Sequence, residues 1–85
     1  VTLKNMIEHA KSVRMGTKKS LMVVDMPYRT YRTKKEALKN SIRVIRETKC
    51  DAVKLEGGFK IKEIIKYLVN QIHLTLKNFS VLQTF

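Results

Sequence analysis

Cysteine is almost absent from this 85-residue chain, which contains only Cys50. A single cysteine cannot form an internal disulfide, and it has no second thiol with which to build a thiolate metal site. Cys50 stands just before an expected strand, where a lone cysteine most often serves as a small buried apolar side chain. We therefore expect it to lie in the core without a chemical role.

Long apolar stretches are missing as well. No run approaches the ~20 apolar residues that a helix needs to cross a bilayer, and the start, Val1-Thr2-Leu3-Lys4, lacks the apolar segment of a signal peptide. We expect a cytoplasmic protein that makes no membrane contact. The chain begins without a methionine, so we also expect that its start was removed or that it is a piece of something longer.

Acidic residues are scarce, since 7 Asp and Glu face 18 Lys and Arg and leave a net charge of +11. A basic surface gains affinity for nucleic acid by displacing counterions from phosphates. The positive charges are spread along the whole chain, however, with a local concentration from Arg29 to Lys49. We favour a solvated charged surface and keep nucleic-acid binding as the alternative.

Helical spacing of apolar residues appears in three segments. The first, within residues 3–13, has Thr2 placed as an N-cap and Gly16 as a stop. The second opens with Thr33 and Glu36, which have the capping-box form. Its apolar stripe is Ala37, Leu38, Ile42 and Ile45. The basic residues mainly off that stripe, which we expect to be exposed, are Lys35, Lys39, Arg43 and Arg46. The apolar stripe of the third expected helix is Ile61, Ile64, Ile65 and Leu68.

Strand patterns alternate with these helices. The expected strands are 20–25, which Pro27 ends, 51–56, which Gly57 and Gly58 close, and 72–76, which alternates apolar and polar residues. The order α-β-α-β-α-β indicates an α/β fold with parallel strands. A (β/α)8 TIM barrel needs ~250 residues, so the chain is either part of such a barrel or a small open α/β layer.

Three ionisable residues fall at the carboxyl ends of the first two strands. Asp25 ends the first strand, while Lys54 and Glu56 project on one face of the second and Val53 and Leu55 on the other. Ligands bind at this end of parallel α/β folds. Two carboxylates and a lysine suit Mg²⁺ with a substrate carboxylate or oxyanion. A purely structural interpretation, either a Lys54–Glu56 ion pair or an edge strand with one wet face, stays open.

The amino-acid sequences around Asp25 and around Lys54 and Glu56 resemble those of the ketopantoate hydroxymethyltransferase family. The run from Val23 to Tyr28, followed by Thr30-Tyr31, is similar to a strand and loop of that family, and Asp51-Ala52-Val53-Lys54-Leu55-Glu56-Gly57-Gly58 is the most specific part of the match. The resemblance covers about residues 1–71. Residues 72–85 are interpreted as a divergent C-terminal strand and tail.

The resemblance implies a partial (β/α)8 TIM barrel from an enzyme that forms cyclic homo-oligomers, commonly decamers. The family transfers a hydroxymethyl group from 5,10-methylenetetrahydrofolate to 3-methyl-2-oxobutanoate, giving 2-dehydropantoate (ketopantoate) for pantothenate biosynthesis, with Mg²⁺ chelating the keto acid. By that match Asp25 would bind both Mg²⁺ and substrate, Lys54 would contact the keto acid, and Glu56 would complete the metal environment. No residue is assigned to the folate.

The chain also departs from the family pattern. The family's Gly-Asp-Ser motif would lie before Val1 and its general-base glutamate beyond Phe85, so no catalytic residue is assigned here. Arg29 stands where the family often has glycine. The expected His-x-Gly-x-Thr-Pro-Gln strand is not seen after Gln71, and residues 77–85 do not match.

Three functional hypotheses follow. The first is an incomplete hydroxymethyltransferase, for which nucleic acid is not an expected partner. The second is a small basic nucleic-acid-binding protein derived from a barrel fragment. The third is another Mg²⁺-dependent barrel lyase, which the two family segments disfavour.

Overall fold

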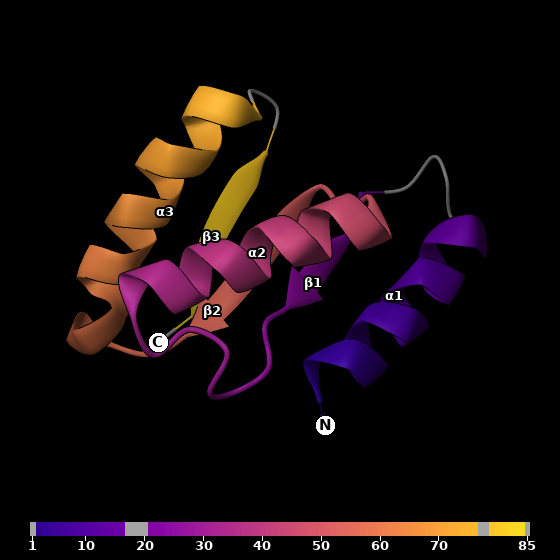
Figure 1. Ribbon diagram of the computed structural model, residues 1–85, viewed down its shortest axis with the longest axis horizontal. Helices are drawn as coiled ribbons and strands as arrows, with labels where there is room; N and C mark the ends of the chain where they lie inside the picture. Colours follow the sequence, from indigo (N-terminus) through magenta and orange to yellow (C-terminus); the bar gives the residue numbers. More distant parts are fainter. Residues whose placement is uncertain (1, 17–20, 77–78, 85) are drawn as a thin grey trace.

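The computed structural model describes residues 2–16, 21–76 and 79–84, which fold into a three-stranded parallel sheet with helices along one side. The helices are α1 (Leu3–Gly16), α2 (Lys34–Thr48) and α3 (Lys62–Thr75), and a 3-10 turn, η1 (Phe59–Ile61), precedes α3. The strands are β1 (Val23–Asp25), β2 (Ala52–Glu56) and β3 (Ser80–Thr84), arranged β1-β2-β3 with β2 in the centre (Figure 1). The expected α/β class with parallel strands is confirmed.

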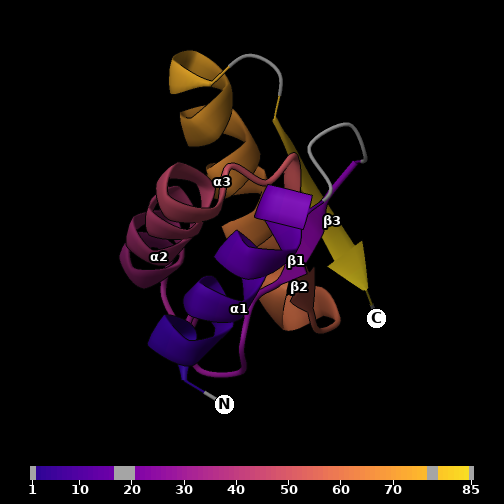
Figure 2. The same ribbon diagram turned by 90° about the vertical axis from the view of Figure 1, so that its right-hand side faces the viewer.

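The two faces of the sheet differ in burial. Figure 2 shows α2 and α3 on one side of the strands, with the opposite face uncovered. Val24, Val53 and Val81 are aligned across the sheet on the helix-covered face, where Val53 and Leu55 are fully buried. This alternation follows from the period of two in a strand. The ionisable residues of β2 therefore project from the uncovered face.

The helix starts agree with the sequence expectations in part. Thr2 Oγ1 accepts from the Asn5 backbone N–H at 3.1 Å, and Thr33 Oγ1 accepts from the Glu36 N–H at 3.1 Å. Glu36 does not close the expected capping box on Thr33, because its carboxylate accepts from the backbone N–H of Arg32 at 2.8 Å and pairs with the Arg32 guanidinium at 3.1 Å. The reciprocal bond is displaced by one residue towards the N-terminus.

The third strand was placed wrongly by the sequence pattern. Residues 72–75 belong to α3, and the strand is formed by Ser80–Thr84 instead. Ile72 is only 1% exposed and continues the helical spacing of Ile61, Ile64 and Leu68, whereas Leu74 is 78% exposed. Five alternating residues fit the last turns of an amphipathic helix as well as a strand. β1 is also shorter than expected, and Ser20 lies outside the described residues.

Two expectations about single residues and surfaces are borne out. Cys50 is buried, and this burial raises the pKa of its thiol. The four basic residues of α2 named above are all exposed. Among the described residues, no helix has both the length and the apolarity required to cross a membrane.

Asp51 joins three segments at the amino end of the sheet. Its Oδ2 accepts from the Met22 backbone N–H at 2.7 Å and from Arg14 Nη2 at 2.6 Å, while Arg14 Nε donates to the Lys49 carbonyl at 3.0 Å. The Met22 N–H, followed by the Arg14 guanidinium, holds the pKa of the Asp51 carboxyl below its usual value. The carboxylate thus connects α1, β1 and the start of β2.

This network predicts an acid-dependent loss of stability. Because the folded-state pKa of Asp51 is depressed, its contribution is present above the unfolded pKa of about 3.9 and is lost as pH falls towards the lower folded value. We expect Asp51→Asn to lower Tm at pH 7 and to flatten the decrease in Tm that occurs as pH falls below about 4. Thermal melts followed by circular dichroism measure this, with the exposed Glu8→Gln as control. An unchanged acid slope in Asp51→Asn would show that the network does not contribute.

Candidate functional site

The parallel register brings Asp25 and Lys54 together. Asp25 on β1 is aligned with Lys54 on β2, and Lys54 Nζ lies 3.1 Å from Asp25 Oδ1. The Asp25 side chain is 75% exposed and the Lys54 side chain is 39% exposed, so the pair is open to solvent and to ligands. Of the structural alternatives, the Lys54–Glu56 ion pair is replaced by one between strands. The edge-strand alternative is wrong, because β2 is the central strand of the sheet, although the face that carries Lys54 and Glu56 is left uncovered by the helices.

Asp25, Lys54 and Glu56 line a single cavity, which we call the strand-end cavity. Its volume is about 480 Å³. The described residues that line it are Asp25, Met26, Tyr28, Tyr31, Lys54, Glu56, Gly57 and Thr84. The sequence prediction that the three ionisable residues converge is therefore met geometrically. Their roles in binding metal and substrate remain predictions.

The ligand set in this cavity suits a divalent cation only in part. The described residues contain no group of three or more His, Cys, Asp or Glu side chains placed to hold a metal ion. The cavity instead offers the carboxylates of Asp25 and Glu56, both on exposed side chains. Mg²⁺ is commonly held by one or two carboxylates and keeps several water or substrate oxygens as further ligands. The donors fit such an ion, provided that other oxygens complete its shell.

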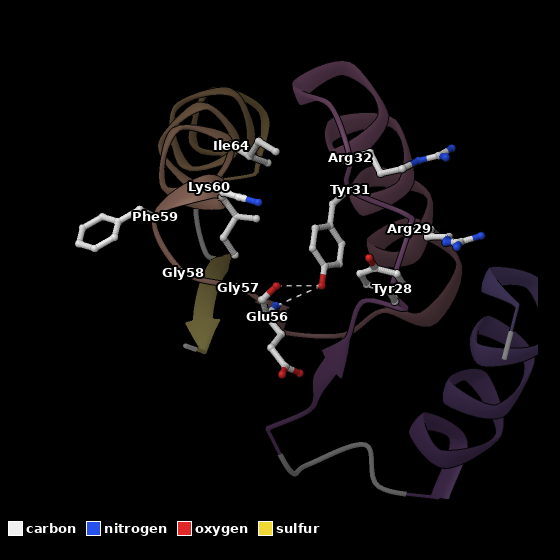
Figure 3. A pocket seen from close by; sticks show the side chains of 11 residues that line it. Tyr28, Arg29, Tyr31, Arg32, Glu56, Gly57, Gly58, Phe59, Lys60 and Ile64 are labelled. Carbon is white, nitrogen blue, oxygen red and sulfur yellow. Dashed lines mark hydrogen bonds between the residues drawn. The ribbon is translucent and has the colours of Figure 1, made fainter.

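Tyr31 holds the backbone at the end of β2. Its side chain is 8% exposed, and its hydroxyl donates to the Glu56 carbonyl at 3.0 Å and accepts from the Glu56 N–H at 3.3 Å. Figure 3 shows the Tyr31 ring directed towards the Glu56 backbone, while the Glu56 carboxylate extends away from it. Tyr31 thereby restrains the segment that presents this carboxylate.

β3 restrains the glycine turn that follows Glu56. Gln83 Nε2 donates to the carbonyls of Gly57 at 2.9 Å and Gly58 at 3.1 Å, and the Gly57 N–H donates to the Thr84 carbonyl at 2.8 Å. Sequence reasoning missed this contribution, because residues 77–85 showed no match to the family pattern. No local signal identifies Gln83, since its role depends on the pairing of β3 with β2.

A larger, more apolar cavity adjoins the first. It measures about 640 Å³ and shares Tyr28, Tyr31, Glu56 and Gly57 with the strand-end cavity. Its remaining lining is Arg29, Arg32, Gly58, Phe59, Lys60, Ile61 and Ile64. In Figure 3 the side chains of Phe59 on one side and of Arg29 and Arg32 on the other point away from the space between them. The shared residues Tyr28, Tyr31, Glu56 and Gly57 form the boundary between the two neighbouring cavities.

Arg29 occupies a backbone conformation that favours glycine. Its φ is 74°, and its guanidinium lies 5.8 Å from the centroid of the Tyr28 ring. Left-handed φ values are rare for residues that carry a Cβ. The loop thus keeps a glycine-type conformation although the residue is an arginine. The side chain lies over an exposed tyrosine at the rim of both cavities.

Comparison with known proteins places these features in a family. The model of the ketopantoate hydroxymethyltransferase family matches residues 1–74. A protein of Pelagibacter ubique named 3-methyl-2-oxobutanoate hydroxymethyltransferase is 68% identical over 69 residues, covering 81% of this chain and 27% of that protein. Proteins of the same name from Rhizobium etli and Parvibaculum lavamentivorans are 49% and 46% identical over 72 and 93 residues.

The alignments differ in how much of the C-terminal segment of this chain they include. The Rhizobium alignment covers 84% of this chain and 26% of the relative, whereas the Parvibaculum alignment covers all of this chain and 34% of the relative. The expected division at residue 71 stays a prediction. The chain spans about a quarter to a third of the length of the curated relatives it matches. It belongs to the ketopantoate hydroxymethyltransferase family.

Proposed function

We propose that this chain forms part of the keto-acid and Mg²⁺ site of a 3-methyl-2-oxobutanoate hydroxymethyltransferase. The reaction would transfer a hydroxymethyl group from 5,10-methylenetetrahydrofolate to 3-methyl-2-oxobutanoate and yield 2-dehydropantoate. The observation that carries this proposal is the convergence of Asp25, Lys54 and Glu56, from adjacent parallel strands, on one cavity. It gains weight because the chain belongs to the family and its relatives bear this name.

The charge balance of the cavity supports a divalent cation together with a monoanion. The carboxylates of Asp25 and Glu56 and the ammonium of Lys54 sum to a charge of −1, so a free keto acid would be repelled. A bound divalent cation would change the local charge to +1 and favour a single carboxylate ligand. The site is therefore suited to an anionic substrate only when the cation is present.

Each residue would have a separate task. Asp25 and Glu56 would supply oxygen ligands to Mg²⁺, and Lys54, already 3.1 Å from Asp25, would hold the carboxylate or keto oxygen of the substrate. When bound, Mg²⁺ would polarise the keto carbonyl and make the adjacent C–H more acidic. Tyr31 and Gln83 would keep the Glu56–Gly58 backbone in place during binding. The resemblance assigns proton removal to a residue outside this chain, so we expect binding without turnover.

The architecture supports a place for the chain within a larger barrel. Its strands are parallel, β1 and β3 are the outer strands of the sheet, and the ionisable residues project from the face that the helices leave uncovered. In a (β/α)8 barrel that face would become the interior, with the site at the carboxyl ends of the strands. The larger neighbouring cavity would then suit the bulkier folate co-substrate. Homo-oligomer formation follows from the same resemblance.

Binding of Mn²⁺, a paramagnetic substitute for Mg²⁺, tests this proposal. We expect water-proton relaxation to reveal Mn²⁺ binding that tightens at least ~3-fold when 3-methyl-2-oxobutanoate is added, because the two ligands complete each other's environment. Asp25→Asn should weaken Mn²⁺ binding by about 10-fold or more, since one of two carboxylate ligands is lost. Glu63→Gln, an exposed substitution on α3, provides the matched control.

The outcomes separate the proposal from its alternatives. Equal Mn²⁺ affinity in the native chain, Asp25→Asn and Glu63→Gln would show that Asp25 is not a ligand. Mn²⁺ binding that needs Asp25 but ignores the keto acid would contradict the substrate assignment. Tighter binding of pyruvate than of the branched keto acid would favour the third hypothesis, a different lyase.

A further inference from the structure

A groove on the outer side of α2 combines positive charge with an apolar floor, and we call it the α2 groove. Among the described residues, none lines both this groove and the strand-end cavity. Its volume is about 540 Å³. The described residues that line it are Lys35, Leu38, Lys39, Ile42, Arg43, Arg46 and Glu47 from α2 and Tyr67 from α3. The helix α3 lies beside α2 (Figure 1).

The positive charges of the α2 groove follow one line along the helix. Lys35, Lys39 and Arg43 are spaced four residues apart, and Arg46 follows three residues later, so the line extends over roughly 16 Å. Arg43 pairs with Glu47 at 2.8 Å. Within the described part of the chain, Lys35, Lys39 and Arg46 make no salt bridge. Like charges at this spacing destabilise a helix, so the arrangement is unfavourable for folding alone.

The floor of the groove is apolar and incompletely covered. Leu38, Ile42 and Tyr67 are half-buried. Leu38 packs against the hydrophobic core from the edge, and Lys34 Nζ lies 5.9 Å from the centroid of the Tyr67 ring. A half-buried apolar floor next to a row of cations can receive a partner that is apolar on one face and acidic on its flanks.

We propose that the α2 groove binds an acidic amphipathic helix of another polypeptide. Such a helix would place apolar residues at three- and four-residue spacing on the floor and carboxylates opposite Lys35, Lys39 and Arg46. A second copy of this chain cannot supply that face, because its 7 acidic residues are scattered and Glu36 and Glu47 are already paired with arginines. A nucleic acid would satisfy the charges and leave the apolar floor in water.

A synthetic helical peptide tests the proposal with the full 85-residue chain. The probe is an acetylated 18-residue peptide with Leu at three- and four-residue spacing and Glu beside it, and its partner peptide has the same composition in scrambled order. We expect fluorescence anisotropy to show at least ~5-fold tighter binding of the amphipathic peptide at about 0.15 M salt, where long-range attraction is screened. An 18-base-pair DNA duplex should bind more weakly than the amphipathic peptide.

Lys39→Glu distinguishes a binding role from a structural one. It should weaken peptide binding about 10-fold, yet raise Tm by about 3 °C, because it replaces like-charge neighbours with opposite ones. Lys4→Glu on α1, the same charge change at an exposed position, should alter binding less than ~2-fold.

Several results would overturn the proposal. Equal affinity for the amphipathic and the scrambled peptide would show that the apolar floor does not contribute to binding. Tighter binding of DNA than of the amphipathic peptide would identify a phosphate-binding surface instead. Equal losses of peptide affinity in Lys39→Glu and Lys4→Glu would show that binding depends on the net charge of the chain and not on the α2 groove. Concentration-dependent dimerisation that Lys39→Glu abolishes would assign the groove to a contact between copies. None of these outcomes affects the Mn²⁺ experiment, which concerns other residues.

Discussion

Leu55→Ala should lower the free energy of unfolding by about 3 kcal/mol, because it empties a fully enclosed leucine site. Leu55 is 0% exposed on the central strand β2, on the face covered by the helices. In a domain of this size such a loss corresponds to a decrease in Tm of about 15 °C. Urea denaturation followed by far-ultraviolet circular dichroism measures it.

Leu82→Ala is the matched control for Leu55→Ala. Leu82 lies on β3, is aligned with Lys54 on the uncovered face, and is 41% exposed. We expect its replacement to cost less than about 1 kcal/mol, since less apolar surface is returned to water. Equal costs for the two variants would mean that both faces of the sheet are covered in solution. That result would contradict the one-sided arrangement of the helices.

Gly57→Ala should be the most damaging change at the site itself. Gly57 has a φ of 151°, and a Cβ there would lie 3.1–3.2 Å from three side-chain atoms of Ile61. Ile61 is 8% exposed and part of the core, so it has little room to move. We expect a loss of about 2 kcal/mol from backbone strain, together with displacement of the Glu56 carboxylate. Thermal melts and Mn²⁺ binding report the two effects.

Gly16→Ala provides a control of opposite sign for Gly57→Ala. Gly16 ends α1, and a Cβ built there meets nothing within 4 Å. Alanine is favoured over glycine in a helix by roughly 0.5–1 kcal/mol, so Tm should rise slightly. A Gly57→Ala variant as stable as Gly16→Ala would show that the turn after β2 adapts. The rigid presentation of Glu56 would then have to be abandoned.

The link between these changes is the segment from Leu55 to Gly58. Leu55 anchors it to the core, Glu56 presents a carboxylate to the strand-end cavity, and Gly57 allows the chain to turn. Tyr31 and Gln83 hold its backbone from two other segments. Core packing and hydrogen bonds therefore both restrain the segment at which the proposed ligand would bind.

The Lys54–Asp25 contact shows where sequence reasoning reached its limit. That Lys54 and Glu56 share a face follows from the period of two in a strand. That Lys54 pairs with Asp25 depends on the register of β1 against β2, which the local sequence does not contain. The sequence therefore suggested Glu56, the carboxylate nearer in sequence, as the ion-pair partner of Lys54, and this suggestion is incorrect.

The secondary-structure prediction for the C-terminal segment was wrong for a related reason. Ile72, Leu74 and Leu76 alternate as in a strand, yet Ile72 occupies the helical stripe of α3 and Leu74 faces solvent. Five residues carry too little periodicity to separate the two structures. Pairing with β2, a contact between residues distant in sequence, then placed β3 at Ser80–Thr84.

The sequence by itself determined the α/β class, the parallel strands, the amphipathic helices and the shared face of Lys54 and Glu56, because these depend on periodicity and on chain order. It also carried the family resemblance in contiguous stretches. Only the tertiary structure decided the Lys54–Asp25 pair, the Tyr31 and Gln83 contacts with the Glu56–Gly58 segment, and the groove between α2 and Tyr67. Each of these joins residues far apart in the chain, and their meeting is set by packing and register rather than by local preference.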